Sequence, residues 1–309
     1  MTGTDRPNPL PRRRLLRAGL AVTGTAMAAT ALSGPAATAA PDARVRAGQA
    51  ELAELERRHG ARLGVYARNV RTGRTVSHRA GERFAMCSTF KVFAAAAVLR
   101  DHGGCAPLDR VVHYPPHDLM PNSPRTEENQ VTGMTVADLC AAAIRYSDNA
   151  AGNLLLREVG GPAGLTRFLR SLGDAVSRLD RWEPELNTAV PGDPRDTTTP
   201  EAIAGSLERV TLGRALADAD RERLVTWLKG TATSADRFRK GLPGDWVVAD
   251  KTGTGDYASA HDIGVAWTTR GTPLVLAVLS GKATPDAPVD QALIADAAAV
   301  LARTLAPGE

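Results

Sequence analysis

Strand-like segments stand at both ends of this 309-residue chain and enclose a long stretch with helical periodicity. The strand-like segments are residues 62–68, 74–78, 246–251, 262–269 and 273–280. Two of their connections, 69–73 and 270–272, are short and contain glycine, which is typical of hairpins. Because a hairpin joins neighbouring strands, the two ends of the chain should form one largely antiparallel sheet.

Helical periodicity fills most of the remaining chain. The predicted helices are residues 42–58, 90–100, 136–146, 150–159, 163–172 and 289–305. We therefore predict an α/β fold of the α+β type. Residues 40–85 and 231–309 would form a domain with helices packed on an antiparallel sheet, and residues 86–230 would form an inserted all-helical domain. The active site is expected between these two domains.

Residues 1–39 have the organisation of an export signal. Residues 12–17, Arg-Arg-Arg-Leu-Leu-Arg, resemble the twin-arginine motif, an apolar stretch continues to Leu32, and residues 37–39 form an A-x-A-like cleavage site. We expect a secreted or periplasmic protein with no membrane attachment after signal removal. The alternative, an uncleaved anchor, is disfavoured because Arg17 and several Gly and Thr residues interrupt the apolar stretch.

The formal charge of +4 also resides in this segment. Of 38 basic and 34 acidic residues, residues 1–39 hold five and one, which leaves 33 of each in the remaining chain. A balanced body has no general attraction for polyanions, so we expect no nucleic-acid partner.

The number and spacing of cysteine and histidine residues limit which disulfides and metal sites the chain can form. Cys87, Cys105 and Cys140 are odd in number, so an exported monomer keeps at least one free thiol. The six histidines lack the spacing of a metal site, and neither C-x-x-C nor H-E-x-x-H occurs. We therefore expect neither a metal nor a cofactor.

A Ser-x-x-Lys motif at residues 88–91 opens a predicted helix. The i,i+3 spacing puts the Ser88 hydroxyl and the Lys91 amine on one helical face, where a neutral lysine can accept the serine proton. The motif alone is weak, because an exposed serine and a surface lysine arise at this spacing by chance. Lysine is scarce here, however, with five residues in the whole chain.

Two further motifs follow in order, Ser147-Asp148-Asn149 and Lys251-Thr252-Gly253. Together with Ser-x-x-Lys they form the set found in class A β-lactamases and penicillin-binding proteins. Residues 181–196 resemble the Ω-loop of class A β-lactamases, and the resemblance covers the chain from about residue 40 to its end. In that family Arg181 and Asp196 would pair to close the loop, and Glu183–Pro184 would be a cis peptide.

The resemblance implies a role for each motif residue. Ser88 would attack the lactam carbonyl and become acylated, while Lys91, Glu183 and a water share the proton transfers. Ser147 would pass a proton to the departing nitrogen. The backbone N–H groups of Ser88 and Thr254 would form the oxyanion hole. Substrate contacts are implied for Asn149, Asn187, Arg237, Lys251, Thr252, Gly253 and Thr254.

The sequence departs from common members of the family at several positions. Ala260 stands where many members have an arginine, and Arg237 would supply the carboxylate-binding guanidinium instead. Asn122 replaces a frequent aromatic residue at the pocket rim. Cys140 matches one half of a disulfide known in some members, but Ala95 occupies the partner position, so we expect no bridge there.

The implied activity is hydrolysis of the β-lactam amide of penicillins and cephalosporins, conferring antibiotic resistance, by a monomer whose partner is this small-molecule substrate. The alternative is a D,D-peptidase or penicillin-binding protein, which is acylated without fast deacylation. Glu183 and Asn187 favour the hydrolase, because together they would hold the water that releases the acyl group. A silent lactam-binding protein is a third, weaker alternative.

Overall fold

The structure, a computed structural model, describes residues 43–102 and 106–309, which belong to one compact unit. The export signal expected over residues 1–39 and Cys105 lie outside the described residues. None of the described helices combines the length and hydrophobicity needed to cross a bilayer.

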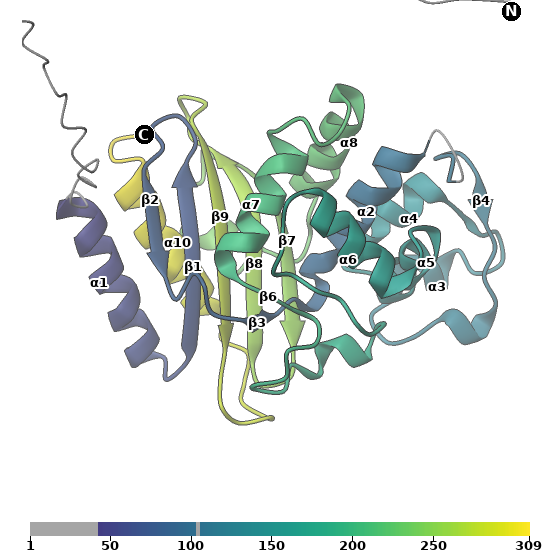
Figure 1. Ribbon diagram of the computed structural model, residues 1–309, viewed down its shortest axis with the longest axis horizontal. Helices are drawn as coiled ribbons and strands as arrows, with labels where there is room; N and C mark the ends of the chain where they lie inside the picture. The colour runs from purple at the N-terminus through teal and green to yellow at the C-terminus, as the bar shows by residue number, and fades with distance from the viewer. Residues whose placement is uncertain (1–42, 103–105) are drawn as a thin grey trace, which may run out of the picture. The chain divides into compact units, whose positions relative to one another are not determined.

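A five-stranded sheet forms the centre of the fold, in the order β2-β1-β9-β8-β7 (Figure 1). Its strands are β1 (Arg62–Asn69), β2 (Thr75–His78), β7 (Val247–Gly255), β8 (Ser259–Trp267) and β9 (Pro273–Gly281). Every pairing is antiparallel, and β1 from the front of the chain pairs with β9 from its end. The predicted sheet built from both chain ends is confirmed.

Local side chains set the two hairpin turns. In the β1–β2 turn the Asn69 side chain accepts the backbone N–H groups of Arg71 and Thr72, each at 3.0 Å, and Gly73 adopts a φ of 73°. Gly271 in the β8–β9 turn has a φ of 72°. Both glycines take the left-handed conformation that other residues adopt at a cost.

The sheet extends further at one end than its sequence pattern predicts. β7 continues through the Lys-Thr-Gly motif to Gly255, and β8 begins at Ser259 rather than at Asp262. The ladder holds these residues, since Thr254 pairs with Ala260 and Gly255 with Ser259. Gly253 and Gly255 have low strand propensity and no apolar alternation marks this stretch, so only the pairing itself reveals this part of the sheet.

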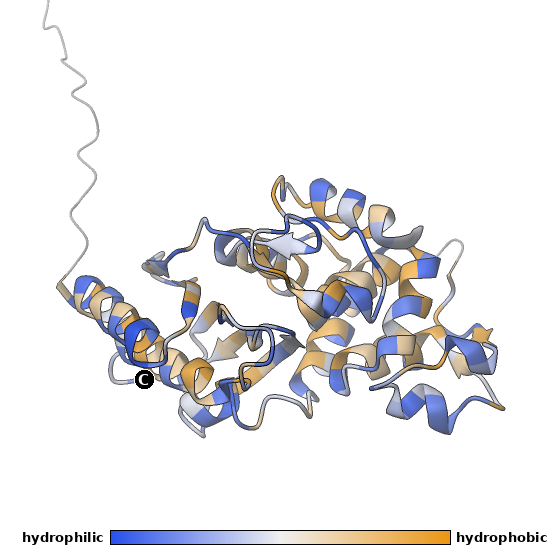
Figure 2. Cartoon of the chain, turned by 90° about the horizontal axis from the view of Figure 1, so that it is seen from below, coloured by the Kyte–Doolittle hydropathy of each residue, from blue (hydrophilic) through white to orange (hydrophobic). Residues whose placement is uncertain are grey.

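Helices cover both faces of the sheet. α1 (Ala43–Arg58) and α10 (Gln291–Leu305) pack together on one face, next to the short α9 (Phe238–Gly241). α7 (Pro200–Thr211) packs against β9, β1 and β8 on the other face. Figure 2 shows mixed hydrophilic and hydrophobic colouring along these helices, as their position between core and solvent requires.

The segment expected to be all-helical is mostly so. Its helices are α2 (Phe90–Asp101), α3 (Pro124–Glu128), α4 (Val136–Arg145), α5 (Asn149–Glu158), α6 (Gly161–Ser171), α7 and α8 (Asp218–Lys229). It also contains three two-residue strands, which is a correction to that expectation. β4 (Val111–Val112) pairs with β5 (Met134–Thr135), and β6 (Thr197–Thr198) pairs with β3 (Phe84–Ala85), which lies just before the segment. These pairs are too short to leave a period-2 pattern in the sequence.

One buried core runs from the helical segment onto the sheet. It joins α2, α4, α5 and α6 to inward-facing residues of β8 and β9, whereas a second core lies between the other sheet face and α1 and α10. α2 lies at the centre of the first core, and ten of its twelve residues are buried. Edge strand β7 packs against the turn before α2, so the fold brings the motifs of distant segments together there.

Candidate active site

Ser88 lies at the start of α2, in the 3-10 turn η1 (Cys87–Thr89). Lys91 follows one turn later and is fully buried, with its Nζ 2.8 Å from Ser88 Oγ. The structure therefore places the hydroxyl and the amine together, as the i,i+3 spacing predicts.

Lys91 is the centre of a polar network. Its Nζ donates to Asn149 Oδ1 at 2.6 Å and to the Ser147 carbonyl oxygen at 2.9 Å, and it lies 2.9 Å from Glu183 Oε1. Both side chains of the Lys91–Glu183 pair are fully buried. A buried ion pair persists only when further hydrogen bonds satisfy both members, and this network supplies them.

In the Ser147-Asp148-Asn149 loop, Asp148 fixes the backbone so that Ser147 and Asn149 both contact Lys91. Asp148 caps α5, since its carboxylate accepts the Ala151 N–H at 2.8 Å, and it also binds the N–H and hydroxyl of Thr126. Ser147 adopts a φ of 58°, a conformation that non-glycine residues rarely adopt. The fixed loop directs Asn149 toward Lys91.

The Ω-loop is closed at its base as the resemblance implies. Arg181 Nε lies 2.6 Å from Asp196 Oδ2, and the same aspartate accepts the backbone N–H groups of Asp180 and Arg181. The Glu183–Pro184 peptide is cis. The short η3 (Glu185–Thr188) follows within the loop.

Glu183 faces both the nucleophile and the loop. Its Oε1 lies 3.3 Å from Ser88 Oγ, and its Oε2 accepts a hydrogen bond from Asn187 Nδ2. The Glu183 backbone is held as well, because Asn153 Oδ1 accepts its N–H and Asn153 Nδ2 donates to its carbonyl, both at 2.9 Å. The Glu183 side chain is fully buried, so its carboxylate is fixed in a dry position.

Strand β7 supplies the opposite wall. Lys251 is fully buried and donates to Ser147 Oγ at 2.9 Å and to the Thr252 carbonyl oxygen at 2.7 Å. Burial, and next the nearby charge of Lys91, hold the pKa of Lys251 well below its usual range. The Thr252 hydroxyl bonds to Thr233 at 2.6 Å.

Arg237 reaches β7 from the loop before α9. Its guanidinium donates to Thr254 Oγ1 at 2.7 Å and to the carbonyl oxygens of Gly253 and His261 at 2.8 and 2.7 Å. Among the residues that the structure describes, no carboxylate forms an ion pair with Arg237 or Lys251. Burial lowers the pKa of Arg237 from its ordinary value, since charging a buried group costs solvation.

The glycine after Thr254 lets β7 approach its neighbours closely. A Cβ on Gly255 would lie 2.6 Å from the carbonyl oxygen of Asn187 and 2.8 Å from Cys87 Sγ. The N–H of Asp256 donates to the same Asn187 carbonyl at 2.9 Å, which ties the strand to the Ω-loop. Any side chain at Gly255 would separate the walls of the site.

The residues given catalytic or substrate-binding roles in the sequence analysis therefore lie together. Ser88, Lys91, Ser147, Asn149, Glu183 and Asn187 lie on the helical side, and Arg237, Lys251, Thr252, Gly253 and Thr254 lie on the β7 side. Sequence reasoning missed Asn153, although its i,i+4 relation to Asn149 on α5 puts both on one helical face. It also missed Thr233, for which the sequence contains no motif.

The remaining candidates have other environments. Cys87 and Cys140 are buried free thiols, and burial raises the pKa of both. No group of three His, Cys, Asp or Glu side chains within residues 43–102 and 106–309 could hold a metal ion. An activated serine, two basic groups and a fixed carboxylate are instead the components of acyl transfer.

Comparison with known proteins agrees with this chemistry. The model of the β-lactamase enzyme family matches residues 48–305. Beta-lactamase AST-1 of Nocardia asteroides is 50% identical over 297 residues, which cover 95% of this chain and 96% of that protein.

Solved structures match equally well. The β-lactamase of Streptomyces albus G has a TM-score of 0.82 at 52% identity and covers 84% of this chain and 99% of its own. An ancestral class A β-lactamase has a TM-score of 0.81 at 51% identity, over 84% of this chain and all of its own. The chain belongs to the β-lactamase enzyme family, within class A.

Proposed function

We propose that this enzyme hydrolyses the β-lactam amide bond in two steps, through an acyl-enzyme on Ser88 and a water activated by Glu183. Membership of the family supports the overall reaction. The observation that carries the two-step mechanism is the position of Glu183, with one carboxylate oxygen 3.3 Å from Ser88 Oγ and the other bonded to Asn187. That geometry suits a base that serves both the nucleophile and a water beside it.

In the acylation step Ser88 Oγ attacks the lactam carbonyl, and its proton passes to a base. Both Lys91 and Glu183 contact Ser88 Oγ, so either can receive the proton directly or through water. Ser147 then gives its hydroxyl proton to the departing nitrogen as the C–N bond breaks, and the proton taken from Ser88 returns to Ser147 through Lys91. Lys251 donates to Ser147 Oγ at 2.9 Å, which favours loss of that proton.

Strand β7 would hold the substrate. It is an edge strand, with no strand partner on its outer side, and it packs against η1, which carries Ser88. The N–H groups of Ser88 and Thr254 would bind the oxyanion there, and Asn149 would contact the acylamide. Lys251, Arg237 and the hydroxyls of Thr252 and Thr254 would bind the substrate carboxylate, for which charged donors are the strongest partners.

Deacylation separates this function from that of a penicillin-binding protein. Glu183 and Asn187 would hold a water that attacks the ester carbonyl while its proton passes to Glu183. The bond to Ser88 Oγ then breaks, and Glu183 returns the proton to that oxygen. A penicillin-binding protein needs no such base. Replacing Glu183 therefore tests the whole proposal.

The experiment compares Glu183→Ala with the wild type in a stopped-flow assay on a chromogenic cephalosporin, with intact mass spectrometry of the protein. We expect sustained turnover by the wild type. The variant should show a burst, a stable adduct on Ser88 and a kcat about 10²–10⁴-fold lower, the contribution typical of a positioned base. Glu185→Ala, which removes an exposed carboxylate of the same loop, is the control. Unchanged turnover in Glu183→Ala would refute the mechanism.

We further propose that the mature enzyme is a monomer, exported by the twin-arginine route with residues 1–39 as its cleaved signal. Residues 12–17 support the route, since both consecutive arginines are part of its motif. Replacing Arg12, Arg13 and Arg14 by Lys should retain the protein inside the cell. Light scattering of the purified enzyme tests the monomer.

A further inference from the structure

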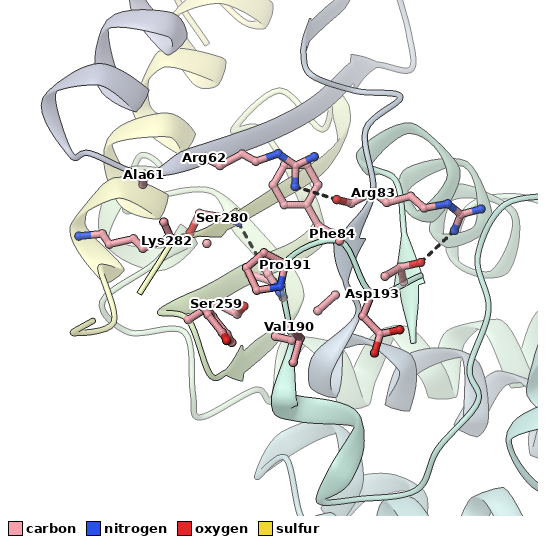
Figure 3. A pocket seen from close by; sticks show the side chains of 18 of the residues that line it. Ala61, Arg62, Arg83, Phe84, Val190, Pro191, Asp193, Ser259, Ser280 and Lys282 are labelled. Atoms are coloured by element: carbon pink, nitrogen blue, oxygen red, sulfur yellow. Dashed lines mark hydrogen bonds between the residues drawn. The ribbon is translucent and has the colours of Figure 1, made fainter. Parts of the chain in front are cut away.

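A cavity lies beneath the second half of the Ω-loop. It has a volume of about 330 Å³ and is enclosed by loop residues 189–193, by β3 and by the adjoining ends of β8 and β9. Figure 3 shows Val190 and Pro191 of the loop facing Phe84 across this space. None of the residues given catalytic or substrate-binding roles lines the cavity. Its contents are therefore not those of the reaction.

Most of the cavity wall is apolar. Phe84, Val190, Pro191 and several alanines contribute to it, and Val190 is 45% exposed. Apolar cavities in proteins bind apolar molecules, and a cavity of about 150 Å³ is enough to hold benzene. The larger volume here has room for an aromatic ring with a short chain.

The charged residues of the cavity wall already have protein partners. Ion pairs join Arg62 to Glu82, Arg181 to Asp196 and Arg195 to Asp193, at 2.7, 2.6 and 2.6 Å. Arg83 donates to Thr197 Oγ1 and to the Val176 carbonyl oxygen, and Lys282 lies 3.5 Å from Asp290. Figure 3 shows Arg83 and Lys282 extending away from the apolar residues in opposite directions. Because an anion in the cavity would lose hydration without gaining a cation, the ligand should be uncharged.

Ser259 provides a polar group for such a ligand. The residue lines the cavity and is 4% exposed, and its hydroxyl has no hydrogen-bond partner among the described residues. The unpaired polar atoms that are closed off from solvent do not include Ser259 Oγ, so this oxygen keeps accessible surface on the cavity side. By contrast, the nearby Ser280 hydroxyl donates to the Ala260 carbonyl oxygen at 3.0 Å. A ligand hydroxyl could both donate to Ser259 and accept from it.

A strained turn holds Ser259 at the cavity wall. Tyr257 and Ala258, between β7 and β8, have φ values of 55° and 51°, in the left-handed region that non-glycine residues rarely adopt. The Ser259 N–H donates to the Asp256 carbonyl at 3.1 Å, and the Lys282 N–H donates to the Tyr257 carbonyl at 2.7 Å. Strain of this kind persists only where surrounding contacts enforce it, and it is common at ligand sites.

We propose that this cavity binds a small uncharged arylalkyl alcohol. The aromatic ring would contact Phe84, Val190 and Pro191, and the ligand hydroxyl would bond to Ser259 Oγ. Since Val190 and Pro191 belong to the loop that carries Glu183, a bound molecule would hold this loop against β3.

Binding is tested with 3-phenyl-1-propanol on the purified enzyme. Ser88 is first blocked with an arylboronic acid, so that the aromatic ring cannot enter the catalytic site. Saturable shifts in the backbone NMR signals of residues 189–193 and Ser259 then report the cavity. We expect 3-phenylpropionate, which has a carboxylate in place of the alcohol, to bind about tenfold more weakly or worse, because its charge would have no free cation there.

Variants locate the site. Ser259→Ala should weaken binding of the alcohol about fivefold, the effect of one hydrogen bond, and leave binding of n-butylbenzene, which lacks the hydroxyl, within about twofold of the wild type. Ala61→Leu puts a larger side chain at the cavity wall and should weaken both ligands about tenfold or more. Ser206→Ala is the matched control, because Ser206 is also buried but its hydroxyl bonds to Asp174 outside the cavity. The bound alcohol should also slow hydrogen exchange of residues 189–193.

Three results would overturn the proposal. The first is the absence of saturable binding by the blocked wild type, which would mean a cavity that holds only water. The second is binding of 3-phenylpropionate as tight as that of the alcohol, and the third is equal weakening of the alcohol and n-butylbenzene by Ser259→Ala. The ligand series on the wild type needs no variant, so a folding failure of Ala61→Leu leaves the test intact. Because binding is measured with Ser88 blocked, the outcome is independent of the catalytic mechanism.

Discussion

The two walls of the active site differ in how their buried charges are paired. On the helical wall Lys91 lies 2.9 Å from Glu183, and the two buried charges balance. On the β7 wall Lys251 and Arg237 have no paired carboxylate among the described residues, and burial lowers the pKa of both. The balanced wall is suited to moving protons, whereas the positive wall is suited to attracting an anion.

Buried aspartates lie next to the positive wall without neutralising it fully. Asp250 pairs with Arg239 at 2.9 Å, while Asp262 accepts the N–H of Phe238. Burial, and next the charge of Asp250, raise the pKa of Asp262 well above its usual range. Neither aspartate forms an ion pair with Arg237 in the described part of the chain, so no carboxylate competes with a substrate carboxylate for Arg237.

Breaking the balanced pair should have the largest effect. Lys91→Met leaves Glu183 as an unpaired buried charge, and we expect the free energy of unfolding to fall by about 3–5 kcal/mol, with turnover essentially lost. The double variant Lys91→Met/Glu183→Gln removes both charges and should regain most of that stability while remaining inactive. Urea unfolding of the four proteins of this cycle measures the coupling. Additive losses would contradict a balanced pair.

Removing a charge from the positive wall should affect binding more than folding. We expect Arg237→Ala to lower kcat/KM for carboxylate-bearing β-lactams by about 10–100-fold, since a charge-assisted hydrogen bond to the substrate contributes about 1.5–3 kcal/mol. The methyl ester of the same substrate is the control, because it lacks the carboxylate. A loss of the same size on the ester would assign Arg237 to structure instead.

His261 lies next to Arg237 of the positive wall, and it should make the free energy of unfolding depend on pH. Its pKa is lowered to about 3 in the folded protein, against about 6.5 for an unfolded histidine, so the unfolded state binds more protons between these values. Neutral His261 therefore contributes to the free energy of unfolding above pH 6.5. This contribution is lost as pH falls, by roughly 2 kcal/mol at pH 5. His261→Gln should remove this component from unfolding curves measured at pH 5 and 7.

A second measurement on His261 tests what causes the lowering of its pKa. Burial is the larger cause and the charge of Arg237 the second, so Arg237→Ala should raise the pKa of His261 by a fraction of the total shift. NMR titration of the ring measures it. Arg239→Ala is the control, because Arg239 is paired with Asp250 and its charge is compensated.

Local pattern was sufficient for much of the fold. The hairpin glycines Gly73 and Gly271, the strand segments and the amphipathic end helices are local features, and each appears in the structure where the sequence indicates it. β7 beyond Lys251 was not predictable, because its polar residues are held by pairing with β8. The two-residue strands are equally invisible to periodicity.

The chain by itself determined which chemical groups are available: Ser88 and Lys91 a helical turn apart, a loop with Glu183 and Asn187, and Lys251 on a strand. Tertiary structure decided how they act. Only packing puts Lys91 between Glu183 and Asn149, fixes Glu183 through Asn153, and buries Arg237 without a paired carboxylate and His261 Nε2 without a hydrogen-bond partner among the described residues. The reason is that burial and pairing, which set charge and basicity, depend on residues far apart in sequence.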